Sequence, residues 1–215
     1  MSFSVAPASA GTADGLLRLR ASAAWKPGPV GAQHASLPSD PILRLRASPK
    51  SPFVRRPASF WKTNAEAIEI IKNAERLRLE AYFLAGQWLI GYGHAGGVTE
   101  GMVITKARAS QLLADDLKIC EQTVGRIVDV PVTRNEFSAL VALCYNIGGA
   151  KLARSHVVEH LNNRDRAQAA NAFLHWRRVT IDDVSKVAAS LVNRRHLERA
   201  LFLTRYTPED SGRTS

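Results

Sequence analysis

Glu75 is the residue whose type and position in this sequence best suit acid–base chemistry. It follows Ile68 and Ile71 along one apolar stripe of an expected amphipathic helix. Burial on that stripe and the negative end of the helix dipole both disfavour a charged carboxylate, although Arg76 and Arg78 act in the opposite direction. A neutral carboxyl group could serve as a general acid. The alternative is a solvated glutamate at a helix end.

His94 is the second candidate, because an imidazole can bind a metal or act as a base. No second His or Cys lies at ligand spacing near it, so a structural histidine is favoured. The sequence also shows no phosphate-binding glycine loop and no Ser/His/Asp or Cys/His arrangement. We therefore expect neither a metal nor a cofactor.

A short β segment must follow the helix that carries Glu75. Residues 88–93 alternate between two faces, which predicts a strand, and residues 82–84 are its expected partner across a turn at 85–87. Residues 98–104 supply a short third element. This segment predicts a small antiparallel hairpin lobe.

The remainder of the chain reads as helices with recognisable start signals. The expected helix starts are Thr63 with Glu66 and Thr133 with Glu136, as T-x-x-E capping boxes, and Thr105, Ser155, Asp165 and Ser185. The helix after Thr133 is apolar on all sides and ends at Gly148, so we expect it to be central. The helix after Asp165 should run to Trp176. The predicted fold class is mainly α (α+β), with a helical body, a small antiparallel β-hairpin lobe and a cleft between them.

Composition limits the classes of protein that this chain can belong to. The 215 residues include 46% hydrophobic ones, enough for one compact domain, and no apolar run approaches the ~20 residues of a membrane span. The first residues show no signal peptide. Cys120 and Cys144 each lie on an apolar helical stripe, so buried reduced thiols are favoured over a disulfide.

Residues 1–60 differ from the rest of the chain. They are rich in Pro, Ser and Ala, carry a net charge of +6 out of the chain's +10, and repeat the six residues LRLRAS. A disordered tail is the favoured interpretation; a short two-faced strand, a basic arm for nucleic acid or a membrane surface, and an untranslated upstream extension are the alternatives. We place the folded domain at 61–205, followed by a flexible C-terminus at 206–215. The basic run at residues 194–196 has no recognition module beside it, so no specific nucleic acid is expected.

From about residue 64 to residue 203, the order of these motifs resembles the phage-type lysozymes, glycoside hydrolase family 24. The matching positions are Glu75 with Leu77, 88–94, Gly101, 104–105, 112–113, 116–117, 130–131, Phe137, 139–140, 145–148, Ser155, 161–162, Trp176, 191–192, 194–195 and Glu198. The resemblance implies a mainly α lysozyme fold with a small β lobe and a sugar-binding cleft.

The resemblance also implies roles for individual residues. The family pattern is a glutamate, then an aspartate, then a threonine, and Glu75 matches the glutamate that protonates the leaving oxygen. Leu84 and Leu89 stand where the aspartate and threonine that handle the attacking water are expected, and the turn between them is one residue shorter. Further implied residues are Tyr145 and Ser155 for substrate binding, and His94 with Asp116, Arg194 and Arg195 as supporting residues.

Two functions from different classes follow from this resemblance. One is a muramidase that hydrolyses the β-1,4 bond between N-acetylmuramic acid and N-acetylglucosamine in peptidoglycan, as an endolysin or a virion-associated protein. The other is a catalytically inactive lysozyme fold that binds glycan or a protein partner. Glycoside hydrolysis uses two carboxylates, so the missing aspartate leaves both open. The expected partners are peptidoglycan strands and, for export of an endolysin from the host cytoplasm, a holin; the expected state is a monomer.

Overall fold

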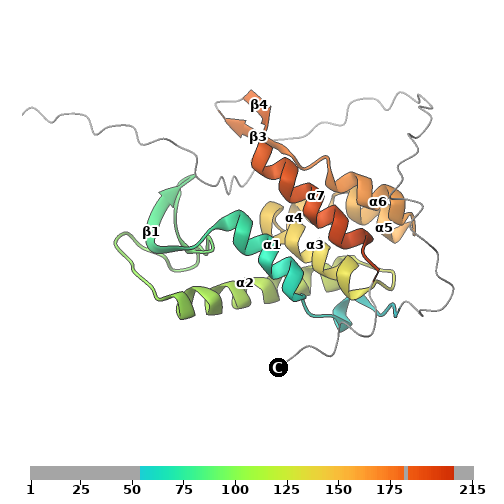
Figure 1. The fold of residues 1–215 in the computed structure, drawn as a ribbon, viewed down its shortest axis with the longest axis horizontal. Coiled ribbons are helices and arrows are strands. Elements are labelled where there is room, and N and C mark those ends of the chain that lie inside the picture. Colours follow the sequence, from blue (N-terminus) through green and yellow to red (C-terminus); the bar gives the residue numbers. More distant parts are fainter. Residues whose placement is uncertain (1–53, 182–183, 206–215) are drawn as a thin grey trace, which may run out of the picture.

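The computed structural model describes residues 54–181 and 184–205 (Figure 1). The LRLRAS repeat, most of the expected N-terminal tail and the expected C-terminal tail lie outside these residues. The elements are η2 (Ala58–Phe60), α1 (Ala65–Glu75), β1 (Arg78–Leu84), β2 (Gln87–Gly91), α2 (Lys106–Ile127), α3 (Arg134–Ile147), α4 (Gly149–Ala153), α5 (His156–Asn162), α6 (Arg166–Phe173), β3 (Arg178–Ile181), β4 (Val184–Val187) and α7 (Ala189–Leu203). The predicted mainly α fold with a small hairpin lobe is confirmed.

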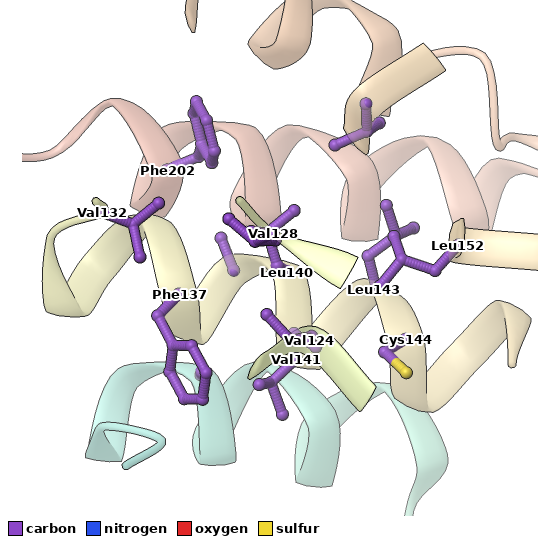
Figure 2. Close-up of a cluster of buried hydrophobic side chains, with 14 of the residues drawn as sticks. Val124, Val128, Val132, Phe137, Leu140, Val141, Leu143, Cys144, Leu152 and Phe202 are labelled. Atoms are coloured by element: carbon purple, nitrogen blue, oxygen red, sulfur yellow. The ribbon is translucent and has the colours of Figure 1, made fainter. Parts of the chain in front are cut away.

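Helix α3 is the centre of the body, as its all-round apolar sequence predicts. Every residue from Asn135 to Tyr145 is buried, and α1, α2, α4 and α7 all pack against this helix. Figure 2 shows Phe137, Leu140 and Leu143 of α3 within the core that these helices share. Its start is the predicted capping box, in which the Thr133 hydroxyl accepts from the Glu136 amide and the Glu136 carboxylate accepts from the Thr133 amide.

The β lobe lies at one end of this body (Figure 1). Strands β1 and β2 pair antiparallel, with Phe83 opposite Trp88 and Leu84 opposite Gln87. The turn therefore holds only two residues. The predicted turn at 85–87 was one residue too long, because Gln87 belongs to β2. The expected third element at 98–104 is reduced to a single bridge between Val103 and Glu80.

The predicted start of α1 is wrong by one residue. The cap is Asn64, whose side chain accepts from the Ala67 amide, and not Thr63. The Thr63 amide and hydroxyl instead donate to the Glu121 carboxylate on α2. Both residue types can cap a helix, and the contact with α2 decides between them.

The predicted last helix begins too early, and the helix after Asp165 ends too late. Helix α6 stops at Phe173 rather than Trp176, and β3 and β4 pair antiparallel where a helix was expected from Ser185. The guanidinium of Arg178 donates to the hydroxyl and carbonyl oxygens of Ser185 across the hairpin. The β-branched residues in this stretch favour strands, and α7 begins only at Ala189.

Residues 54–60, the end of the predicted tail, pack on the body. Arg56 pairs with Val132 in an antiparallel bridge, the Arg55 guanidinium lies 3.5 Å from the Glu136 carboxylate, and Ala58 is buried. The Trp61 indole N–H then donates to the Val132 carbonyl oxygen at 2.8 Å. None of the helices in the described part of the chain has the length and apolarity needed to cross a bilayer.

Candidate active site

Glu75 is the last residue of α1, and its side chain is only 4% exposed. The chain leaves the helix through Arg76, at a positive φ of 52°, and enters β1 two residues later. Its carboxylate is bound at 2.8 Å by the Arg194 guanidinium of α7, 119 residues further along the chain. The burial that the apolar stripe predicts is present, and the ion pair compensates for the lost hydration of the carboxylate.

Arg194 belongs to a buried network on one face of α7. It also donates to the Glu198 carboxylate at 2.9 Å and to the Ala142 carbonyl oxygen at 3.3 Å. Burial opposes the charge of Arg194, but Glu75 and Glu198 together raise its pKa above the usual value. The network therefore fixes Arg194 as a permanent cation beside Glu75.

Arg195 extends the network toward α3. One of its amino groups donates to the Asn146 side chain at 3.0 Å and to Glu198 at 3.1 Å. Burial, only partly offset by Glu198, lowers the pKa of Arg195 to about 10. The family resemblance implied Arg194 and Arg195 as supporting residues but gave no role to Glu198, although the i,i+4 spacing of Glu198 from Arg194 on a helix is a usable signal.

His94 is held as the sequence analysis expects. Its Nδ1 lies 2.9 Å from an oxygen of Asp116 on α2, and its Nε2 lies 2.9 Å from the Gly96 carbonyl oxygen. Both ring nitrogens are thus occupied by protein atoms, which leaves none for a metal. Among the described residues, no group of His, Cys, Asp or Glu side chains is arranged to hold a metal ion.

Leu84 and Leu89 lie on the same face of the β1–β2 hairpin. Leu84 pairs with Gln87 and Leu89 with Tyr82, and cross-strand partners share a face. Leu89 is fully buried, whereas Leu84 is half-buried. Neither side chain can accept a proton or bind water, so this face of the lobe is apolar at the two positions where the family pattern has polar groups.

Two further glutamates, Glu80 and Glu100, belong to the segment that forms the lobe. Glu80 lies within β1, and Glu100 lies in a turn ahead of Val103, the bridge partner of Glu80. Both are exposed. Both face solvent, whereas the Glu75 carboxylate is buried and bound by Arg194.

Tyr145 and Ser155 are both engaged with the protein itself. The Tyr145 hydroxyl donates to the Tyr92 carbonyl oxygen at 3.0 Å, which connects α3 to the end of the lobe. The buried Ser155 hydroxyl caps α5, donating to the Leu152 carbonyl oxygen and accepting from the Val158 amide. Their predicted contact with substrate remains a prediction.

A cavity of about 350 Å³ lies elsewhere, between η2 and α2, and Ser59, Lys62 and Arg126 are among the residues that line it.

The turn that positions Leu84 is strained in a way that can be tested. Ala85 and Gly86 both have positive φ values, 49° and 80°, which suits glycine or asparagine better than alanine. We expect Ala85→Asn to stabilise the protein by about 0.5–1 kcal/mol, which raises the thermal midpoint by roughly 1–4 °C. Gly86→Ala is the matched control, because its added Cβ would meet no atom within 4 Å, so only backbone strain should lower its midpoint. Equal midpoints for both variants would contradict this account.

The described residues thus form a lysozyme-like α+β protein, with a helical body, a hairpin lobe and a buried glutamate–arginine pair where the two meet. The phage lysozyme family model matches residues 72–198. The endolysin of Salmonella phage P22 is 38% identical over 152 residues, which cover 67% of this chain and 100% of that one. The endolysin of Bacillus phage B103 is also 38% identical, over 69% of this chain and 56% of that one.

Solved structures of a muramidase domain and an endolysin are also similar to this chain. The muramidase domain of SpmX from Asticaccaulis excentricus has a TM-score of 0.64 and 38% identity, over 66% of this chain and 98% of that chain. The endolysin from Escherichia coli O157:H7 phage FAHEc1 has a TM-score of 0.62 and 34% identity, over 68% of this chain and 96% of that chain. This chain belongs to the phage lysozyme family.

Proposed function

We propose that this protein is a peptidoglycan-directed lysozyme that hydrolyses the β-1,4 bond between N-acetylmuramic acid and N-acetylglucosamine, with Glu75 as the general acid. The observation that carries the proposal is the position of Glu75, buried at the end of α1 and bound by Arg194 beside the hairpin lobe. The names of the relatives, endolysins and a muramidase, support the same substrate class.

In this mechanism Glu75 protonates the glycosidic oxygen as the bond to the sugar breaks. Arg194 holds the carboxyl group in place and stabilises the carboxylate after the proton has left. A second group must activate or position water at the other face of the sugar, and Leu84 and Leu89 cannot do so. We therefore propose slow turnover, reduced by the ~10²–10⁴-fold that a general base contributes.

A second candidate function is favoured by the same hairpin. The fully buried Leu89 and the half-buried Leu84 make the water-handling side of the site apolar, which suits a protein that binds glycan, or a protein partner, without cutting it. Under either function Tyr145 and Ser155 would position the binding surface, with His94 and Asp116 supporting the lobe. We propose a monomer that acts on wall glycan, with a holin providing export if the protein is an endolysin.

The release of reducing sugar ends from purified peptidoglycan distinguishes the two functions. For an enzyme, we expect Glu75→Gln to lower the rate at least ~10²-fold while sedimentation with insoluble peptidoglycan is retained, because the glutamine keeps the shape but cannot donate the proton. Circular dichroism should show that the variant is folded.

Glu80→Gln and Glu100→Gln are the matched controls, since both residues are exposed glutamates of the lobe region. Unchanged rates in these two variants would assign the acid to Glu75 alone. A wild-type protein that sediments with peptidoglycan but releases no reducing ends would replace the hydrolase with the binding protein.

A further inference from the structure

The cavity between η2 and α2 takes no part in the proposed hydrolysis. Its volume of about 350 Å³ falls within the ~300–1,000 Å³ of small-molecule sites. Helix α2 forms one wall and the segment around η2 forms the other, and these two elements pack directly against each other (Figure 1). The η2 wall precedes residue 72, where the match to the phage lysozyme family model begins. One wall of the cavity is therefore built by residues outside the matched region.

The walls of the cavity are held in place by the fold. The indole N–H of Trp61, which lines the cavity, donates to a backbone carbonyl oxygen at 2.8 Å, so the ring is fixed. Gly125 of α2 permits the close approach of η2, because a Cβ at this position would lie 3.3 Å from the Cα of Ser59. The Thr63 amide and hydroxyl both donate to the Glu121 carboxylate at 2.9 Å, which attaches the chain after η2 to α2. The cavity is thus formed before any ligand binds.

Of the charged side chains that line the cavity in the described part of the chain, only Arg126 is unpaired. The Lys62 ammonium lies 2.9 Å from the Glu121 carboxylate, so these two charges neutralise each other. Burial opposes the charge of Glu121, but hydrogen bonds from Thr63 and Lys62 lower the pKa of Glu121 below its usual value. The exposed guanidinium of Arg126 has no hydrogen bond or ion pair with any residue that the structure describes. The lining therefore has a net charge of +1, located at Arg126.

Two neutral side chains add hydrogen-bond donors to this lining. Gln122 lies one turn before Arg126 on the same face of α2, and Ser59 belongs to η2. Neither side chain bonds to a described residue. A guanidinium binds a carboxylate through two parallel hydrogen bonds, and a single negative charge matches the net charge of the lining. A phosphate group carries about −1.5 to −2 charges at pH 7, which the lining does not balance beside Glu121.

We propose that this cavity is a binding site for a small organic carboxylate. Arg126 holds the carboxylate, Gln122 and Ser59 donate hydrogen bonds to the ligand, and the Trp61 ring packs against its apolar part. Two sources supply this chemistry, namely the C-terminal carboxylate of a wall peptide and a free small acid. Arg126 lies ten residues beyond Asp116, the α2 residue that contacts the lobe, which is roughly 15 Å along the helix. The site therefore does not depend on whether the protein hydrolyses glycan.

The test is a titration of the ¹⁵N-labelled full chain with N-acetyl-D-alanyl-D-alanine, followed by two-dimensional NMR. We expect saturable shifts of the amides of residues 121–126 and of the Trp61 indole N–H, with a roughly millimolar dissociation constant, as is usual for so small a ligand. The C-terminal amide of the same peptide lacks the carboxylate and should cause no saturable shift. Benzoate at equal ionic strength distinguishes the sources. Binding of the peptide alone indicates a wall peptide, binding of benzoate alone indicates a free acid, and binding of both shows that the carboxylate alone is recognised.

Arg126→Gln should weaken binding at least ~10-fold, because the charged hydrogen bonds to the carboxylate are lost. Arg126→Lys keeps the charge without the two-pronged geometry, so its affinity should lie between those of Arg126→Gln and the wild type. Arg108→Gln is the matched control, since Arg108 is an exposed arginine of the same helix outside the cavity, and it should bind like the wild type. The absence of saturable shifts with either acid, or equal affinities for Arg126→Gln and the wild type, would overturn the proposal.

Discussion

Leu84→Asp combined with Leu89→Thr should raise the rate of peptidoglycan hydrolysis by about 10²–10⁴-fold, the usual contribution of a general base. The two positions share a face of the β1–β2 hairpin, so the new carboxylate and hydroxyl would lie on the same side of the lobe. They restore the second polar group that glycoside hydrolysis requires, opposite the acid Glu75. The initial rate of reducing-end release measures the effect.

Leu84→Asn with Leu89→Thr is the matched control, because asparagine has the shape of aspartate but cannot accept the proton. Leu89 is fully buried, so its replacement costs stability in both variants, and rates should be compared below both thermal midpoints. Equal rates for the two double variants would show that no base had been restored. The cause would then be the two-residue turn at Ala85 and Gly86, which sets where residue 84 points.

The parts of the fold that could be predicted are those in which local sequence carries the signal. The capping box of Thr133 and Glu136 and the apolar surroundings of α3 appear in both sequence and structure. The strand pair β3–β4 was missed because each strand is short and β4 lies close to the start of α7 in the sequence. The choice between Thr63 and Asn64 as cap could not be made locally, since it depends on Glu121 of another helix.

In the candidate site, too, local sequence predicts some features, and others depend on contacts with distant parts of the chain. The carboxylate on the apolar stripe of α1 could be predicted from its neighbours in the sequence. Its partner Arg194 lies 119 residues away, and the family resemblance pointed to Arg194 only as a supporting residue. No periodicity predicts which arginine of a pair reaches the acid. Packing decides it: Arg194 points to Glu75, while Arg195, one residue further around the helix, reaches Asn146 of α3.

Arg194→Met should destabilise the protein by about 3–5 kcal/mol, because removing one partner of a buried ion pair leaves the other uncompensated. Arg194 is 4% exposed and binds both Glu75 and Glu198, so the variant leaves two buried carboxylates with Arg195 as their one remaining cation in the network. The expected fall in the thermal midpoint is roughly 6–20 °C. His196→Met, at an exposed position of the same helix, is the control and should change the midpoint little.

The double variant Arg194→Met with Glu75→Gln identifies the cause of this loss. If unpaired charge is responsible, neutralising Glu75 should recover part of the stability, so the double variant should be more stable than Arg194→Met alone. If lost packing of the long arginine side chain is responsible, the second substitution should recover nothing. Recovery would mean that Arg194 serves chiefly to offset the burial of the Glu75 side chain and to hold it in position, and a fixed position is a condition for the proposed acid catalysis.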